Sequence, residues 1–389
     1  MKPKAPEKPE PKAEAVPSIP APEPTFDKQA AADGWIQLFD GSTLFGFKAN
    51  SDLNWTAKEG VLSADTGKPG LLVTNFELAD YELKCDYRLA KGGNSGIFLR
   101  TPLEPKDPTK DCYEFNMCDS HPAFPTGSIV GRKKAETATT GEDVWKSIHL
   151  VVKGNRIQAK IDRKDVLDFT DESESKLVKG HIGLQMNGGK IEFRNVAIKP
   201  MVEPVFGGAN LDGWRPVPGS KAKFDLADGT IHATSGPGFL ETEKTFGDFV
   251  LQFDARTNGA NLNGGLFFRA EPGTEAAPSN GYELQIHNGY KDGDRTKPID
   301  SGTGAIFRRV AARRVIPNDN EWFRATLIAN GLHFSIWVDG YLVTDWTDDR
   351  KPDPNPRKGS RTEAGHISLQ AHDATTDISF RNIGIAAIP

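Results

Sequence analysis

The chain of 389 residues carries 48 basic and 53 acidic side chains, and its formal net charge of -5 gives no chain-wide basic field that would favour nucleic acid as a partner. Hydrophobic residues make up 37 % of the sequence, but none of their runs approaches the roughly 18 to 20 apolar residues of a membrane-spanning helix. The 39 glycines and 27 prolines imply many turns, which favours an all-β chain over a helical bundle.

The N-terminal segment has the composition of a linker. Its first 24 residues include eight prolines, four lysines and four glutamates, and they offer few apolar side chains that could offset the entropy lost on ordering. Proline-rich chains of this kind are extended and semi-rigid. We therefore predict that residues 1–29 form a disordered tether, through which the folded part would be attached to a partner.

After this tether the sequence repeats itself. The clearest matched segments are 38–41 with 205–208, 94–100 with 263–269, 113–114 with 282–283, and 180–185 with 365–370. The offset between the copies grows from 167 to 185 residues along the chain, so insertions lie in the second copy, between shared strands. The repeat predicts two homologous domains, at residues 30–201 and 202–389.

Within each copy the hydrophobic pattern has a period of two, which is typical of half-buried strands. Apolar residues alternate with polar ones over 81–89 and 249–255, and Asp339-Gly340 predicts a tight hairpin turn. The alternation changes phase at Arg-Asn pairs, residues 194–195 and 381–382, which predicts a β-bulge in each copy. No stretch keeps a helical period, so we expect two antiparallel β-sandwiches or jelly rolls, each with one concave face.

Alternation also predicts which polar side chains share a strand face. In the second copy Glu283, Gln285 and His287 lie on one strand, and Gln370 and His372 lie on another. The first copy offers Glu114, Asn116 and Gln185 at the matching positions, and Arg269 and Arg100 end strands that we expect to lie beside them. Amides, carboxylates and guanidinium groups together are the composition of a sugar-binding site.

Other interpretations of these side chains stay open. A half-buried glutamate paired with arginine is common on sheets, so the clusters would then be structural networks. Glu283, His287 and His372 would alternatively bind a divalent cation, although no His-Glu-x-x-His pattern supports this. The basic residues at 132–134, 308–309 and 313–314 fit solvated loops, with contact to an anion or an acidic sugar as the alternative.

The motifs resemble those of the 3-keto-disaccharide hydrolase domain family, whose fold is concanavalin-like. In the first copy the resemblance rests on 38–41, 92–98 with Arg100, 113–114, 127–129, Trp145, 183–185 and 193–195, and the second copy repeats it through 282–285, 304–306, Trp322 and 380–383. The resemblance implies a secreted, periplasmic or cell-surface bacterial protein of carbohydrate metabolism. Its substrate would be a glycoside whose sugar is oxidised to a ketone at C3.

The two copies depart differently from the family's Leu-Gln-Asp-His-Gly motif. The first reads Leu-Gln-Met-Asn-Gly over 184–188 and lacks the histidine, whereas the second reads Leu-Gln-Ala-His-Asp over 369–373 and keeps His372. If either domain is active, the resemblance therefore favours the second.

The activity implied is cleavage of 3-keto-glycosides, by hydrolysis or elimination, because a C3 ketone acidifies the proton at C2. We expect His372 or Glu283 to act as the base and Arg269, or a bound cation, to stabilise the enolate. Gln285 and Gln370 would position hydroxyls, with His287 among the substrate-binding residues, and Arg100, Glu114, Asn116 and Gln185 would bind saccharide in the first domain. The alternative is a non-catalytic tandem carbohydrate-binding or surface-interaction protein, in which two degenerate modules give avidity, or a purely structural one.

Overall fold

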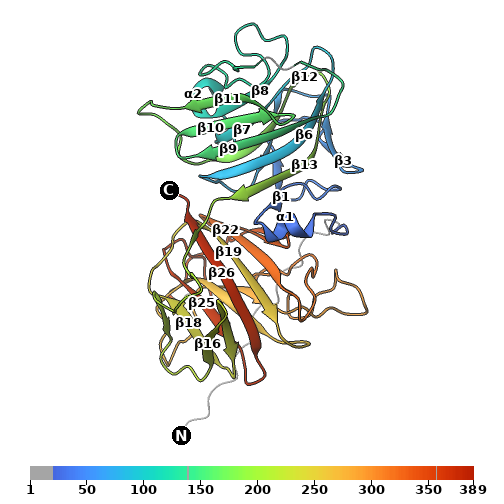
Figure 1. The fold of residues 1–389 in the computed structure, drawn as a ribbon. Coiled ribbons are helices and arrows are strands. Elements are labelled where there is room, and N and C mark those ends of the chain that lie inside the picture. Colours follow the sequence, from blue (N-terminus) through green and yellow to red (C-terminus); the bar gives the residue numbers. More distant parts are fainter. Residues whose placement is uncertain (1–20, 138–139, 356) are drawn as a thin grey trace.

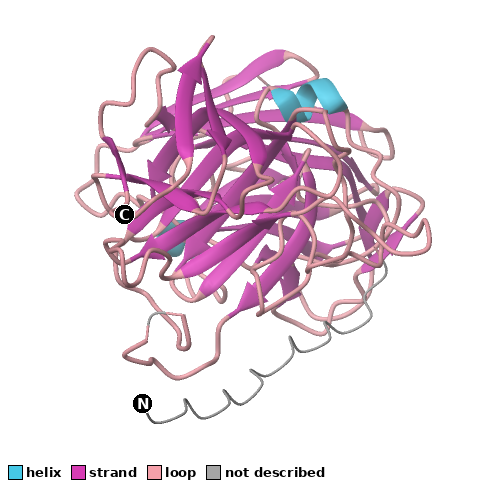
Figure 2. Cartoon of the chain, turned by 90° about the horizontal axis from the view of Figure 1, so that it is seen from below, coloured by secondary structure: helices cyan, strands magenta, loops and turns pink. Residues whose placement is uncertain are grey.

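The computed structural model of the protein describes residues 21–137, 140–355 and 357–389, and almost all of its regular structure is β-strand (Figures 1 and 2). The helices of this part of the chain are the short α1 (Lys28–Ala32) and α2 (Pro108–Asp111). Neither is long or apolar enough to cross a membrane.

The first sandwich consists of two antiparallel sheets. The eight-stranded sheet has the order β11-β10-β9-β6-β13-β4-β3, with β1 paired to β13. Its strands are β1 (Ile36–Gln37), β3 (Thr56–Lys58), β4 (Val61–Ala64), β6 (Tyr81–Leu89), β9 (Lys146–Lys153), β10 (Arg156–Ile161), β11 (Lys164–Thr170) and β13 (Ile191–Pro200). The five-stranded sheet has the order β2-β5-β12-β7-β8, from β2 (Phe47–Ala49), β5 (Gly70–Thr74), β7 (Asn94–Thr101), β8 (Tyr113–Met117) and β12 (His181–Gly188).

The second sandwich repeats this arrangement strand for strand. Its eight-stranded sheet has the order β16-β17-β26-β19-β22-β23-β24, with β14 paired to β26. Its strands are β14 (Glu203–Pro204), β16 (Lys223–Ala227), β17 (Thr230–Thr234), β19 (Phe249–Thr257), β22 (Phe323–Asn330), β23 (His333–Val338), β24 (Tyr341–Thr347) and β26 (Asp377–Ala387). The five-stranded sheet has the order β15-β18-β25-β20-β21, from β15 (Trp214–Pro216), β18 (Gly238–Thr242), β20 (Gly264–Ala270), β21 (Tyr282–Ile286) and β25 (His366–Ala371). The predicted fold class, two tandem all-β sandwiches, is confirmed.

Local predictions for the strands also hold. Buried residues alternate with less buried ones along β6, as its hydrophobic pattern requires. The register of β13 against β6 shifts after Arg194, and Asn195 has a left-handed φ of +54° at this bulge. Asn382 repeats this in β26 with φ of +51°, and Asp339 has a positive φ in the hairpin between β23 and β24.

The two sandwiches are packed against each other (Figure 1). Arg313 and Asp40 form a buried ion pair across the junction at 2.8 Å. The Trp337 indole N–H donates to the backbone carbonyl of Gln37 at 2.9 Å, and the backbone N–H of Gln37 donates to the carbonyl of Gly340 at 2.8 Å. Trp337 is 1 % exposed and belongs to the hydrophobic core of the first sandwich, so the two domains share buried apolar surface.

The boundary of the predicted tether is corrected by the structure. Most of the tether, residues 1–20, lies outside the described residues, but residues 21–29, which we included in it, pack on the second sandwich. Tyr341 donates its hydroxyl to the carbonyl of Pro22 at 3.0 Å, and Arg314 contacts Ala21 and Glu23. A few aromatic and guanidinium contacts of this kind order a proline-rich segment that its composition alone would leave extended.

Candidate active site

The candidate site lies on the outer face of the five-stranded sheet of the second sandwich. In the centre of this face Gly265 of β20 is paired with Gln285 of β21 on one side and with Gln370 of β25 on the other. Paired residues of antiparallel strands share a face, so both amides stand beside a position that has no side chain. A Cβ at Gly265 would lie 3.0 Å from Oε1 of Glu283, so glycine is what leaves room above the sheet.

A cavity of about 220 Å³, which we call the Glu283 cavity, opens above this point. It is lined by Asn263, Glu283, Gln285, Phe307, Arg308, Arg357, Gln370 and His372. The structure thus brings together four of the residues selected from the sequence, namely Glu283, Gln285, Gln370 and His372.

Glu283 is the buried acid of the cavity. Its side chain is 5 % exposed, and its Oε2 lies 3.3 Å from Nη2 of Arg357. Burial disfavours the carboxylate and raises the pKa of Glu283 to about 7, although the nearby guanidinium of Arg357 opposes the shift. Near neutral pH this group can therefore both donate and accept a proton.

His372 is held by the residue that follows it. Its Nδ1 lies 2.8 Å from Oδ2 of Asp373, and hydrogen bonds from Thr375 and His372 lower the pKa of Asp373 to about 2. Because an ionised carboxylate only accepts hydrogen bonds, Nδ1 carries the proton and the lone pair of the neutral ring is on Nε2. This arrangement orients a histidine that can act as a base.

The amides of the cavity offer acceptors. Gln285 donates from Nε2 to Oδ2 of Asp300 at 2.8 Å, and Asn263 donates to the same oxygen at 2.8 Å, which fixes the orientation of the Gln285 amide. Within the described ranges, Oε1 of Gln285 and Oε1 of Gln370 are buried and have no hydrogen-bond partner. Buried acceptors of this kind are normally satisfied, so they indicate a ligand that donates from hydroxyl groups.

The first sandwich holds a reduced version of this site. Burial raises the pKa of Glu114 to about 7, and Gln185 hydrogen-bonds to its side chain. Oε1 of Gln185 is again buried without a partner in the described part of the chain, but Asn116 donates to the carbonyl of Phe124 at 2.5 Å. Asn187 stands where the second copy has His372, so this domain keeps the acid and an amide without the histidine.

The structure corrects the prediction that Arg269 and Arg100 serve these sites. Each has a left-handed φ, +48° and +51°, at a register shift near the end of its strand, and this bulge turns the side chain away from the outer face. Arg269 is fully buried and donates to carbonyls of Gly331 and Arg361 and, at 2.6 Å, to Asp248. Arg100 repeats this pattern, so both arginines connect loops and neither reaches the ligand face.

His287 is the other selected residue that the structure places elsewhere. It follows the last residue of β21, is 7 % exposed, and its Nδ1 accepts a hydrogen bond from the amide of Gly289 at 3.1 Å. It does not line the Glu283 cavity. In the residues that the structure describes, no group of three or more His, Cys, Asp or Glu side chains could hold a metal ion, so Glu283, His287 and His372 do not form the cation site considered above.

Two insertions supply some of the residues that sequence patterns missed. Gly304 follows Tyr282 by 22 positions, against 14 for the matching pair of the first copy, and the added segment carries Asp300. Gly365 follows Asp348 by 17 positions, against nine in the first copy, and this segment carries Arg357. The increase in the residue offset between the two copies indicates both insertions in the sequence.

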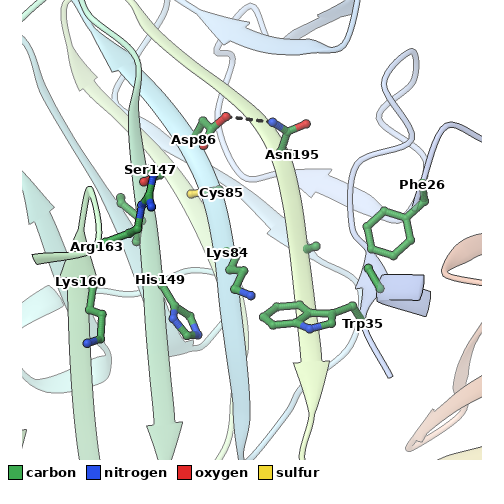
Figure 3. Close-up of a pocket in the computed structure, with 13 residues that line it drawn as sticks. Phe26, Trp35, Lys84, Cys85, Asp86, Ser147, His149, Lys160, Arg163 and Asn195 are labelled. Atoms are coloured by element: carbon green, nitrogen blue, oxygen red, sulfur yellow. Dashed lines mark hydrogen bonds between the residues drawn. The ribbon is translucent and has the colours of Figure 1, made fainter. Parts of the chain in front are cut away.

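A larger cavity, of about 420 Å³, lies on the eight-stranded sheet of the first sandwich (Figure 3). There the ammonium of Lys84 lies 4.0 Å from the ring centre of Trp35, and Asp86 accepts from Asn195 at 2.9 Å. None of the residues selected from the sequence lines it. The smaller Glu283 cavity remains the candidate active site, because it combines a titrating acid, an oriented histidine and unpaired acceptors.

Comparison with known proteins agrees with the repeat. The model of the 3-keto-alpha-glucoside-1,2-lyase-like domain matches residues 34–199 and 202–386. A 3-keto-disaccharide hydrolase of Bacteroides thetaiotaomicron is 25 % identical in an alignment 228 residues long, and the match covers 43 % of this chain and 79 % of that protein.

Solved structures with a similar fold include two from bacteria. One, from Parabacteroides distasonis and described as a candidate glycosyl hydrolase, is 21 % identical, covers 46 % of this chain and 98 % of its own, and has a TM-score of 0.40. The carbohydrate-binding module CBM66 of Bacillus subtilis is 17 % identical, covers 41 % and 98 %, and has a TM-score of 0.33. Since the family model matches both sandwiches, and together most of the chain, the protein belongs to the 3-keto-alpha-glucoside-1,2-lyase-like domain family and carries two copies of that domain.

Proposed function

We propose that the second sandwich cleaves the glycosidic bond of 3-keto-glycosides in the Glu283 cavity. The observation that carries the proposal is that one cavity holds an acid with a pKa near neutrality and a histidine oriented by a carboxylate, beside unpaired amide oxygens. The family and the name of the Bacteroides relative support the same chemistry.

The reaction begins at C2 of the oxidised sugar. Nε2 of His372 removes the C2 proton, whose acidity comes from the adjacent ketone, and the electron pair moves into the C2–C3 bond and onto the ketone oxygen. When the ketone re-forms, a C1–C2 double bond forms, the bond from C1 to the glycosidic oxygen breaks, and that oxygen takes a proton from Glu283. Addition of water across the new double bond would complete a net hydrolysis.

The surroundings of the two groups suit these roles. Asp373 stabilises the imidazolium that forms when His372 takes the proton, because its own carboxyl stays ionised. Arg357 lies 3.3 Å from Glu283 and stabilises the carboxylate that remains after Glu283 donates. Gln285 and Gln370 accept hydrogen bonds from sugar hydroxyls through their unpaired oxygens.

Saccharide binding without cleavage is the second candidate function, and the first sandwich favours it. That domain keeps Glu114 and an unpaired acceptor on Gln185, but it has Asn187 at the position of the histidine. We assign it a recognition role, in which the two linked modules bind one saccharide chain with greater avidity than either alone.

The test is release of a chromogenic aglycone from a 3-keto-glucoside by the purified protein. We expect release by the wild type and its loss in His372→Ala, while Asn187→Ala, the matched change in the first sandwich, leaves turnover intact. Full turnover by His372→Ala would contradict the assigned base. Absence of release, together with calorimetric binding of the same sugar, would establish the recognition alternative.

A further inference from the structure

A strongly basic cavity adjoins the Glu283 cavity. It measures about 320 Å³ and shares Glu283, Phe307, Arg308 and Arg357 with the smaller one. We call it the basic cavity, and the remainder of its lining is Gly281, Tyr282, Ile306, Arg309, Arg350, Asn355 and Lys358. The two cavities are therefore adjacent, and these four residues contribute to the walls of both.

The charges of this lining are almost all of one sign. Five basic side chains, three of which are Arg309, Arg350 and Lys358, face a single carboxyl, that of Glu283. Burial raises the pKa of Glu283 to about 7, so this carboxyl is only partly charged near neutral pH. A concave site with walls of one sign concentrates its field and attracts the opposite charge, even though the whole chain has a net charge of -5.

Some basic residues of this cavity form ion pairs that both sandwiches contain, and others occur only in the second sandwich. Arg350 pairs with the buried Asp348 at 2.7 Å, much as Arg132 of the first sandwich pairs with Asp171 at 3.0 Å. In contrast, Arg357 and Lys358 lie in the insertion between Asp348 and Gly365, which the first copy lacks.

The insertion is held in position by polar contacts. Arg357 donates to Oγ of Ser279 at 2.9 Å, and its own carbonyl accepts from Arg309. The domain that retains the histidine is thus also the one in which an added guanidinium, that of Arg357, is fixed beside the buried acid.

We infer that the glycoside bound by the second sandwich carries a negatively charged group, a carboxylate, phosphate or sulfate, that occupies the basic cavity. Guanidinium groups bind such oxyanions through charge-assisted and often bidentate hydrogen bonds. The placement of the sugar in the Glu283 cavity rests on the proposed function. The charged group then lies on the part of the glycoside that is remote from Gln370 and His372, which line only the Glu283 cavity.

Calorimetric binding to the full chain tests this inference with a matched pair of probes. 4-Carboxyphenyl glucoside and 4-nitrophenyl glucoside have similar size but differ in charge, so this pair tests a charge on the aglycone. Glucuronic acid and glucose 6-phosphate, each compared with glucose, test a charge on the sugar. The comparison of these two acids distinguishes a carboxylate from a phosphate. We expect at least one anionic probe to bind about 10-fold more tightly than its neutral partner at low salt, with the advantage lost at high salt.

Variants locate the effect. Lys358→Gln changes an exposed residue that lines only the basic cavity, and we expect it to lower the advantage of the anionic probe without changing the affinity of the neutral one. Lys351→Gln, an exposed change in the same insertion that lines neither cavity, is the control. Anionic probes that bind no better than neutral ones, or an advantage unchanged by Lys358→Gln, would overturn the inference.

Cleavage assays separate this inference from the proposed function. Equal cleavage of neutral and anionic 3-keto-glycosides would overturn the anion preference and leave the proposed chemistry in place. Preferential binding of an anionic probe without cleavage of either 3-keto-glycoside would support the anion site and contradict the proposed chemistry.

Discussion

The buried acid of the second sandwich makes stability depend on pH. The pKa of Glu283 is about 7 in the folded protein, against an ordinary value of 4.5. A carboxyl whose pKa rises on folding contributes stability that is fully present below about pH 4.5, and this contribution is lost as the pH rises to about 7. Glu283→Gln cannot ionise, so the variant is spared this loss.

The size of the effect follows from the shift. At about 1.4 kcal/mol per pKa unit, the loss from Glu283 between pH 5 and pH 8 amounts to about 2 to 3 kcal/mol. The difference in unfolding free energy between Glu283→Gln and wild type should therefore move by that amount in favour of the variant over this range. Comparing two pH values removes the constant cost of leaving Arg357 without its partner.

Urea unfolding followed by circular dichroism, at pH 5 and pH 8, measures this difference. Glu275→Gln removes a charge from an exposed site and serves as the control, for which we expect no comparable change. Glu114→Gln should behave like Glu283→Gln, because the pKa of Glu114 is also raised to about 7 by burial. A difference between Glu283→Gln and wild type that stays constant across this range, or that moves in favour of the wild type, would refute the reasoning.

Three further predictions concern residues with separate roles. His372→Ala should lower the turnover of a 3-keto-glycoside by about 10²- to 10⁴-fold. Wild-type turnover should fall as the pH rises through about 7, because Glu283 must be protonated to donate. Rates measured across pH for both proteins check these expectations. Arg269→Ala should lower the unfolding free energy by about 3 to 5 kcal/mol, because this buried guanidinium connects loops. The affinity of the folded protein for saccharide should be unchanged. Denaturant unfolding measures the stability, and calorimetry measures the affinity. Arg313→Ala should destabilise the junction between the two sandwiches by a similar amount, because the buried carboxylate of Asp40 loses its cation. Scanning calorimetry should then resolve the two sandwiches as separate unfolding transitions.

The fold was predictable because its signals are local. Alternating hydrophobic residues require strands with one buried face, and the phase change at 194–195 and 381–382 requires an extra residue there, as the left-handed Asn195 and Asn382 show. The same alternation placed Glu283, Gln285 and Gln370 on one face, because neighbouring antiparallel strands share their side-chain directions.

The rest of the site depends on backbone geometry that periodicity does not encode. Arg269 would face the ligand on a regular strand, but the bulge at its left-handed φ turns it inward. Arg357 and Asp300 come from insertions, whose paths are set by tertiary contacts and not by a repeating pattern. Sequence reasoning located those insertions but not which of their side chains would reach the cavity.

The measurement that tests the central claim most directly is proton nuclear magnetic resonance of a 3-keto-glucoside during turnover in D₂O. The proposed chemistry predicts that the protein releases the aglycone, that the original C2 proton is lost from the sugar, and that both events are slowed by about 10²- to 10⁴-fold in His372→Ala. Aglycone release with the C2 proton fully retained would contradict abstraction at C2, and absence of release by the wild type would contradict cleavage.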